Sequence, residues 1–309
     1  MVRFAVHQES DLPSISCHLP LHSSPHLAKS SESHKSYKAP SATAKTQFPK
    51  SVSISEILQA GKLVKPKPKK KATLLLEKFD VKTGEWHEGE PLELLVDAEK
   101  FSSGGFRDAL LATSCNHEEK QKWVIKKYNA KAKDAIINTL RTTEEDHTRK
   151  QVQMHSAARQ LTEQFSNKVP SHFGRCLHYN RVFYTKFEDE PATVEEYVPG
   201  FFFKYLNNNG ECCSAPEKCS NEHKELFLKA ECLVHYWYEY SKHKLMLLDI
   251  QGSKYQLYDP EIATTNLVCE SSSEFLFCCG NLSTEFTKKH ICSDYCEMLE
   301  LPPVVHNFD

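Results

Sequence analysis

The stretch LMLLDIQGSKYQLYDPEIAT, residues 245–264, holds the side chains best suited to chemistry. Its apolar residues lead into Asp249, Gln251 follows after one residue, and Asp259 lies ten positions beyond Asp249. Carboxylate and amide oxygens at the end of a buried strand suit a hard cation such as Mg²⁺. The alternative is ordinary turn chemistry at a strand end, where Asp and Gly are common. The stretch therefore indicates a metal–phosphate site without excluding a simple turn.

Two lysines stand in unusual sequence contexts, and the first of them is a candidate for contacts with nucleotide phosphates. Lys126 lies in the strand-like segment WVIKKY, downstream of the pair Gly104–Gly105. A glycine loop followed by a lysine on a strand is an arrangement that holds such phosphates. Lys204 lies among aromatic residues in VEEYVPGFFFKYLNNNG, just before a run of asparagines. A glycine turn beside a surface lysine, or a lysine that extends its amine to solvent from an apolar strand, would give the same patterns.

The segment HICSDYC, residues 290–296, has the spacing H-x-C-x₃-C. Imidazole and thiolate ligands at this spacing suit a closed tetrahedral zinc site, which needs a fourth ligand from elsewhere. His223, His235 and His243 are all available, and the spacing does not choose among them. The alternative is a set of buried free cysteines, which behave as small apolar residues.

The hydrophobic patterns from Ala72 onward predict a mixture of strands and helices. Strands are expected at 72–101, 106–113, 122–130, 181–187, 192–198 and 244–250, and helices at 143–166, 223–240 and 283–299. This order predicts an α+β fold with two lobes, in which strand ends and loops carry the candidate residues.

Residues 1–71 differ from the rest because they are rich in Ser, His, Lys and Pro. Such a composition predicts a disordered tail. It ends in the basic run Lys65–Lys71, which is either a nuclear-localisation or polyanion-binding patch or a solvated linker. We expect a cytoplasmic protein without a membrane span, with a nuclear location through this run left open. In that reducing compartment most of the twelve cysteines would be free thiols or metal ligands.

Several motifs, in the same order, resemble those of the α-kinase family of atypical protein kinases between about residues 101 and 301. The matching segments are GGFRDAL, WVIKKY, VEEYVPGFFFKYLNNNG, DIQG followed by YDPEIAT, and GNLSTEFTKKHICSDYCEMLEL. The resemblance implies a two-lobed α-kinase domain over 72–309, with an N-lobe at about 72–194 and a C-lobe at about 195–309. It also implies an ATP-dependent protein serine/threonine kinase that acts on protein substrates.

The same resemblance implies roles for individual residues. For the nucleotide, Lys126 would contact the α- and β-phosphates and Glu195 the adenine. The remaining residues of the phosphate loop would be Gly104, Gly105 and Arg107. For catalysis and metal, the implied residues are Asp249 to orient the substrate hydroxyl, Lys204 and Asn208 to assist transfer, and Gln251 and Asp259 to hold Mg²⁺.

The resemblance also selects His235 as the fourth ligand of a structural zinc, beside His290, Cys292 and Cys296. Two departures from the family pattern stand out. CCGNLSTEF replaces a glycine-rich loop before the zinc segment, and DPEIAT replaces a common D-P-Q-I-H-T. Because the residues implied for nucleotide and metal binding are present, we expect a catalytically active enzyme. The alternatives are a catalytically silent ATP-binding scaffold and, from another class, a nucleic-acid-binding zinc protein, against which the net charge of -2 argues.

Overall fold

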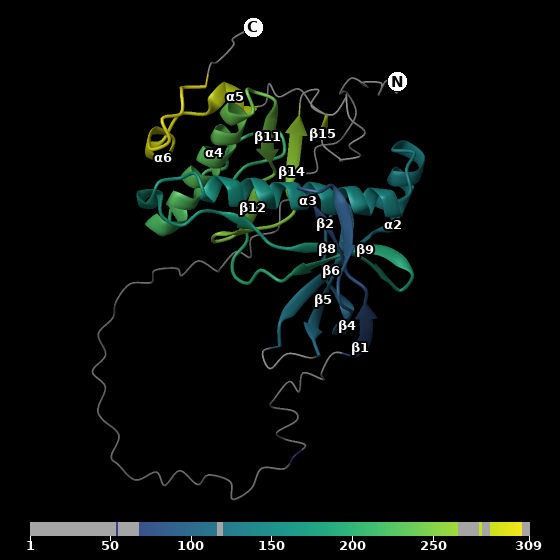
Figure 1. The fold of residues 1–309 in the computed structure, drawn as a ribbon. Helices are drawn as coiled ribbons and strands as arrows, with labels where there is room; N and C mark the ends of the chain where they lie inside the picture. Colours follow the sequence, from purple (N-terminus) through teal and green to yellow (C-terminus); the bar gives the residue numbers. More distant parts are fainter. Residues whose placement is uncertain (1–53, 55–67, 116–119, 265–277, 280–284, 305–309) are drawn as a thin grey trace, which may run out of the picture. The chain divides into compact units, whose positions relative to one another are not determined.

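The structure is a computed structural model that describes residue 54 and residues 68–115, 120–264, 278–279 and 285–304 (Figure 1). The chain divides into two compact units, Met1–Leu63 and Val64–Asp309, and all strands and helices below lie in the second. The first strand begins at Lys69, three residues before the expected start of the folded region. Most of the segment expected to be disordered, and most of the CCGNLSTEF loop, lie outside the described residues.

The first large element among the described residues is an eight-stranded sheet with the order β1-β4-β5-β6-β9-β8-β2-β3. All its neighbouring pairs are antiparallel. The strands are β1 (Lys69–Leu74), β2 (Glu77–Asp80), β3 (Glu85–Glu88), β4 (Leu92–Ser103), β5 (Arg107–Ser114), β6 (Lys122–Tyr128), β8 (Val182–Phe187) and β9 (Glu190–Glu196). Their alternating apolar side chains form one core cluster that includes the fully buried Leu94, Ile125 and Val194. The expected strands of the N-terminal half are therefore confirmed.

Helix α3 (Glu144–Ser166) confirms the helix predicted at 143–166. Thr143 is its N-cap, because the threonine side chain accepts a hydrogen bond from the N–H of Asp146. The helix packs against β8 of the large sheet and against β14 in the C-terminal part, so it borders both (Figure 1). Before it, α2 (Ala130–Asp134) continues into the π-helical turn η1 (Ala135–Thr139), for which the sequence had offered no prediction.

The C-terminal part is built around α4 (Asn221–Tyr240), which confirms the helix expected at 223–240. Two small sheets lie beside it, in the orders β10-β12-β13-β7 and β11-β14-β15. Their strands are β7 (His178–Tyr179), β10 (Phe203–Lys204), β11 (Leu245–Leu248), β12 (Gln251–Ser253), β13 (Gln256–Leu257), β14 (Glu261–Thr264) and β15 (Cys278–Cys279). A second core cluster, with Leu233, Met246 and Leu257 fully buried, joins these elements to α3.

The single helix predicted at 283–299 is wrong. The described part of that segment forms two short helices, α5 (Glu285–Lys289) and α6 (Asp294–Glu297). Between them His290 ends the first helix and Ser293 has an extended backbone, with φ -101 and ψ 171. The break turns His290 and Cys292 toward α4, which a continuous helix would not allow because their side chains would follow its regular rotation.

Candidate functional site

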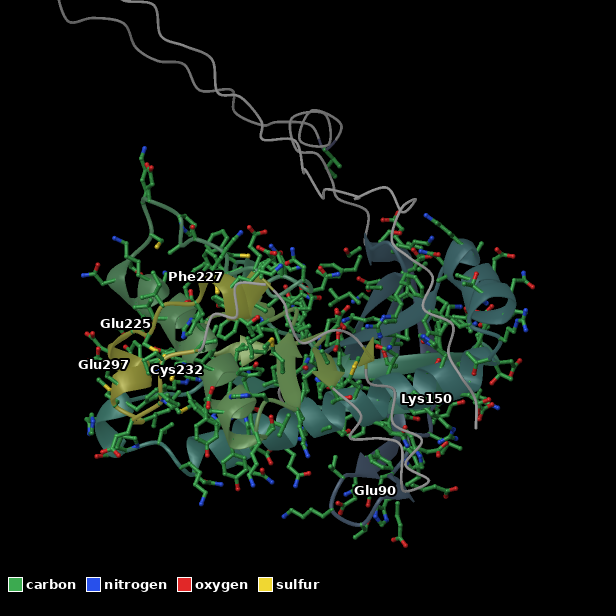
Figure 2. All side chains as sticks on the ribbon, turned by 90° about the horizontal axis from the view of Figure 1, so that it is seen from above. Glu90, Lys150, Glu225, Phe227, Cys232 and Glu297 are labelled. Atoms are coloured by element: carbon green, nitrogen blue, oxygen red, sulfur yellow. The ribbon has the colours of Figure 1, made fainter. Side chains whose placement is uncertain are left out.

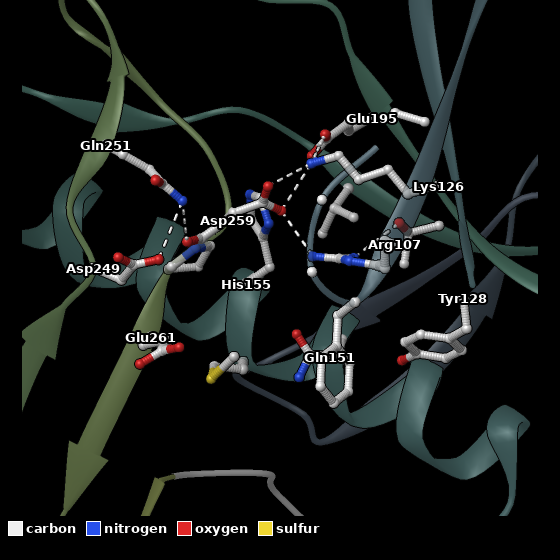
Figure 3. Close-up of a pocket in the computed structure, with 18 of the residues that line it drawn as sticks. Arg107, Lys126, Tyr128, Gln151, His155, Glu195, Asp249, Gln251, Asp259 and Glu261 are labelled. Atoms are coloured by element: carbon white, nitrogen blue, oxygen red, sulfur yellow. Dashed lines mark hydrogen bonds and ion pairs between the residues drawn. The ribbon is translucent and has the colours of Figure 1, made fainter. Parts of the chain in front are cut away.

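A cavity of about 610 Å³ lies between the large sheet and the C-terminal part. Its wall includes the turn Gly104–Phe106 and side chains from several strands of the sheet. The strand ends around Asp249 and Asp259 form another part of the wall (Figure 3). A second cavity of about 480 Å³ shares Lys126, Glu195, Gln251 and Asp259 with the first. Aromatic side chains line this second cavity, namely Phe101, Tyr197, Phe202 and Tyr258. One end of the joint cavity is thus charged and the other is aromatic.

Lys126 reaches this cavity from the middle of β6. Its Nζ lies 2.8 Å and 2.7 Å from the two carboxylate oxygens of Asp259, and it also pairs with Glu195. The register of β6 and β9 places Val124 opposite Glu195 and Lys126 opposite Thr193, so both charged side chains extend from the same face. The Lys126 and Glu195 side chains are only 11% and 5% exposed. Burial raises the pKa of Glu195, and the charge of Lys126 opposes that rise.

Asp259 is the carboxylate on which two cations converge. Arg107 at the start of β5 donates from Nη2 to Asp259 Oδ1 at 2.8 Å, beside the Lys126 contacts. Burial alone would raise the pKa of Asp259, but Lys126 and Arg107 hold it well below its usual range. The carboxylate is therefore ionised at neutral pH. Its backbone has φ 51, a left-handed conformation that Asp tolerates better than most residues.

Asp249 forms a second centre in the same cavity. Lys204 Nζ lies 2.6 Å from Asp249 Oδ1, because β10 pairs with β12 and sets Lys204 opposite Gln251. Gln251 Nε2 donates to Asp249 Oδ2 at 3.2 Å and to the backbone oxygen of Asp259 at 3.4 Å (Figure 3). Burial raises the pKa of Asp249, and the hydrogen bond from Lys204 counteracts it. Gln251 thus links the two acidic residues that the sequence singled out.

Gly252 keeps this arrangement compact. A Cβ at this position would lie 2.1 Å from the backbone oxygen of Gln256, closer than any real contact. The β12–β13 hairpin therefore requires glycine because of close backbone approach, not because of a positive φ. The glycine of DIQG sets the distance between the strand that carries Gln251 and the strand that leads into Asp259.

The roles assigned from sequence to two residues remain predictions. The side chain of Glu195, assigned to adenine, pairs with Lys126. Asn208 lies in an exposed turn and is not among the described residues that line either cavity. The remaining assigned residues do meet at the cavity: Gly104, Gly105, Arg107, Lys126, Asp249, Gln251 and Asp259 line it, and Lys204 contacts Asp249.

Helix α3 contributes lining residues that the sequence reasoning missed. His147, Gln151, Met154 and His155 follow one another at helical spacing and face the cavity. Burial lowers the pKa of His155 to about 4, so its ring is neutral at pH 7. The helical period was visible in the sequence, but it marks a buried face without saying whether that face borders core or cavity. Glu261, in place of the common glutamine of the family motif, also lines the cavity.

A second cluster gathers the four residues predicted to hold zinc. His235 lies on α4, His290 directly follows α5, Cys292 lies in the break between α5 and α6, and Cys296 lies on α6. Their ligand atoms all lie within 4.8 Å of one another. His290 Nε2 is 3.3 Å from His235 Nδ1, Cys292 Sγ is 3.8 Å from His235 Nδ1, and Cys296 Sγ is 3.7 Å from His290 Nε2.

These distances fit a tetrahedral zinc ion. Zn–N bonds of about 2.0–2.1 Å and Zn–S bonds of about 2.3 Å place two nitrogens about 3.3 Å apart and nitrogen and sulfur about 3.5 Å apart. Cys232 of α4, which lies beside α6 in Figure 2, hydrogen-bonds Cys296 and is the largest cause of a strongly lowered pKa at that thiol. Glu231 lies 3.3 Å from His290 Nδ1, where a carboxylate orients a metal-binding imidazole. The donor set and its surroundings therefore fit a structural zinc.

Comparison with known proteins identifies the family. The model of the Alpha-kinase family matches residues 102–296, more than half of the chain, so the chain belongs to the α-kinase family. Members of this family are protein kinases. The resemblance inferred from the motifs is thereby confirmed.

The chain is similar to parts of three larger curated proteins. It is 30% identical to human transient receptor potential cation channel subfamily M member 6 over 164 residues, 51% of this chain and 8% of that protein. It is 31% identical to myosin heavy chain kinase B of Dictyostelium discoideum over 115 residues, 36% and 13% of the two chains. It is 23% identical to human eukaryotic elongation factor 2 kinase over 241 residues, 73% and 29% of the two. The chain thus spans less than a third of each.

Solved structures show the same fold. The α-kinase domain of myosin-II heavy chain kinase A in complex with AMP-PNP matches with a TM-score of 0.57 at 18% identity, covering 77% of this chain and 98% of that domain. The complex of the same domain with ADP gives a TM-score of 0.57 at 18% identity, covering 76% and 98%. Among the described residues, no helix combines the length and the apolar character needed to cross a membrane.

Proposed function

We propose that the chain is an ATP-dependent protein serine/threonine kinase that transfers the γ-phosphoryl group of Mg-ATP to protein hydroxyls. The observation that carries this proposal is the meeting of Lys126, Asp249, Gln251 and Asp259 at one cavity with a glycine turn at its wall. Phosphoryl transfer requires mainly positioning and charge neutralisation, and this set of cations, carboxylates and amides supplies both.

In this proposal the phosphates of the nucleotide bind cationic side chains that contact a carboxylate of the cavity in the protein without nucleotide. Lys126 and Arg107, which contact Asp259, would turn to the phosphates, with Gly104 and Gly105 beside them. Asp259 would then be free to bind a cation. The base would occupy the aromatic cavity, next to the backbone that follows β9, where Glu195 was expected to contact it. Binding is thus an exchange of ion pairs rather than the filling of an uncharged pocket.

Gln251 and Asp259 are the residues that would hold Mg²⁺, as the sequence predicted. Nε2 of Gln251 donates hydrogen bonds to Asp249 and Asp259. Its Oε1 accepts no hydrogen bond among the described residues, which leaves this oxygen for the cation. A carbonyl oxygen and a carboxylate are suitable ligands for this hard cation. When bound, Mg²⁺ would neutralise negative charge on the phosphates.

Asp249 would orient the acceptor hydroxyl and accept its hydrogen bond. Its raised pKa makes it a stronger proton acceptor than an exposed aspartate, while the ion pair with Lys204 limits that rise. Lys204 would also lie close to the charge that develops on the transferred group. The resemblance assigns the same step to Asn208, which lies in an exposed turn after β10.

We also propose that the cluster of His235, His290, Cys292 and Cys296 holds a structural zinc. Four ligands leave no open position for catalysis, and they tie α4 to the segment of α5 and α6. The eight cysteines whose side chains the structure describes form no disulfide. We propose a reducing, cytoplasmic setting for the chain, in which cysteines serve as thiols or metal ligands.

The test is incubation of the full chain with labelled Mg-ATP and a generic basic protein, followed by phosphoamino-acid analysis. The proposal predicts label on serine or threonine. A folded chain that binds ATP and transfers no label would instead support the silent scaffold, and label on tyrosine alone would contradict the assigned specificity.

A further inference from the structure

The turn Gly104–Phe106 at the wall of the cavity has every backbone carbonyl held by one residue, Asn129. The side-chain amide of Asn129 donates from Nδ2 to the oxygen of Gly104 at 3.3 Å and to that of Gly105 at 3.1 Å. Its backbone N–H donates to the oxygen of Phe106 at 3.1 Å. The sequence had singled out the glycines but not the residue that holds them.

Asn129 is itself held by helix α2, for which it is the N-cap. Its Oδ1 accepts a hydrogen bond from the N–H of Ala132 at 2.9 Å, and its backbone oxygen accepts one from Lys133 at 3.0 Å. Because Oδ1 caps the helix, the two amide hydrogens must face the turn. Serine, threonine or aspartate could cap α2 equally well, but only asparagine combines this acceptor with two side-chain donors.

The arrangement determines which backbone groups remain for a ligand. Gly104 N–H donates to the oxygen of Arg107 at 2.8 Å, whereas the N–H groups of Gly105 and Phe106 have no hydrogen-bond acceptor among the described residues. Peptide units next to glycine rotate at little cost, so a free turn could present carbonyl oxygens to the cavity. Carbonyls repel phosphate, and successive N–H groups attract it.

We propose that Asn129 is the positioning residue of the phosphate loop: it holds the three carbonyls away from the ligand and leaves the N–H groups of Gly105 and Phe106 for phosphate oxygens. The inference rests on the proposed function for its ligand, an ATP phosphate. The clamp itself is a property of the protein without nucleotide, so it can be tested separately.

The experiment compares the full wild-type chain with Asn129→Ser and Asn129→Asp. Serine retains a capping acceptor without adding charge, and aspartate keeps the size and the cap, but neither can donate to both carbonyls. The control is Ser220→Ala, which removes the N-cap of α4, another helix whose cap has no contact with the turn. Two quantities are measured: hydrogen exchange of the peptide covering residues 102–107 without nucleotide, and the Kd for a fluorescent ATP analogue.

Both Asn129 variants should exchange faster in this peptide than the wild type and bind the analogue about tenfold more weakly, as expected for two lost hydrogen bonds. Ser220→Ala should leave both quantities unchanged. Wild-type exchange and affinity in both variants, or equal changes in Ser220→Ala, would overturn the inference. If the wild type binds no ATP analogue, the proposed function fails, while the exchange data still decide whether Asn129 clamps the turn.

Discussion

Asp259→Asn should strengthen the binding of metal-free ATP, although Asp259 is placed in the catalytic machinery. Without nucleotide the carboxylate holds Lys126 and Arg107 through contacts of 2.7–2.8 Å, so it competes with phosphate for both cations. Asparagine keeps the size of the side chain but removes the competing charge. In the presence of Mg²⁺ the same change should weaken binding, because it removes a ligand for the cation.

The magnitude follows from the contacts. Hydrogen bonds to charged groups contribute about 1.5–3 kcal/mol each, and Asp259 is 30% exposed, which favours the lower end. Taking one such bond at the lower end, neutralising the competitor should release about 1.5 kcal/mol, which corresponds to a Kd about tenfold lower without metal. The assay is calorimetric titration with ATP at fixed ionic strength, with EDTA and then with Mg²⁺.

Asp249→Asn is the matched control for this titration. It removes one negative charge from the same cavity, but Asp249 pairs with Lys204 rather than with Lys126 or Arg107. Its effect on metal-free binding should be much smaller. Weaker metal-free binding by Asp259→Asn, or equal gains in the two variants, would refute the idea that Asp259 competes with the phosphates for two cations.

Three further predictions concern metal, stability and pH. Elemental analysis should find about one zinc per chain. Cys296→Ala should lose the zinc and unfold at a lower temperature, whereas Cys219→Ala, outside the cluster, should retain it. A folded, metal-free wild type would contradict the zinc proposal. Gly252→Ala should lower the free energy of unfolding by about 2–4 kcal/mol in urea titration, because its Cβ would overlap the Gln256 carbonyl; a change below about 0.5 kcal/mol would contradict the close approach of the two strands. Burial lowers the pKa of His155 from 6.5 to about 4, so the unfolded chain binds the extra proton and stability should fall as the pH drops from 6.5 toward 4; His155→Gln should flatten this slope, and an unchanged slope would count against a buried neutral ring.

Local sequence patterns predicted correctly those features that depend on residues close together in the chain. The helix at 143–166 followed from its apolar spacing, and the structure adds Thr143 as its N-cap. The stretch with Asp249 and Asp259 was singled out because carboxylates at the end of an apolar strand suit a hard cation, although a simple turn would give the same pattern. The spacing of HICSDYC indicated three of the four residues that the structure brings together at the zinc cluster.

Long-range pairing decided what the sequence left open. Spacing could not choose among His223, His235 and His243; the packing of α4 against α6 selects His235. The pairing of Glu195 with Lys126 depends on the register between β6 and β9, which no local pattern reveals. The sequence does not reveal the contacts of Asn129 with the turn, because an asparagine before a short helix is typical of an ordinary N-cap.

The break in the predicted helix at 283–299 has a similar origin. Its residues have adequate helical character, but His290 and Cys292 turn toward His235 on another helix. That constraint acts between segments far apart in the chain. Helical propensity amounts to less than about 1 kcal/mol per residue, so tertiary contacts of this kind override it.

The most direct test of the proposed kinase activity is the initial rate of phosphate transfer from Mg-ATP to a generic basic protein by the full chain and its Asp249→Asn variant. Glu90→Gln, which neutralises an exposed carboxylate that lines neither cavity, is the control for charge. We predict transfer by the wild type and by Glu90→Gln, with a rate at least about 100-fold lower for Asp249→Asn. Equal rates in all three proteins, or no transfer by a folded wild type that binds ATP, would contradict the account.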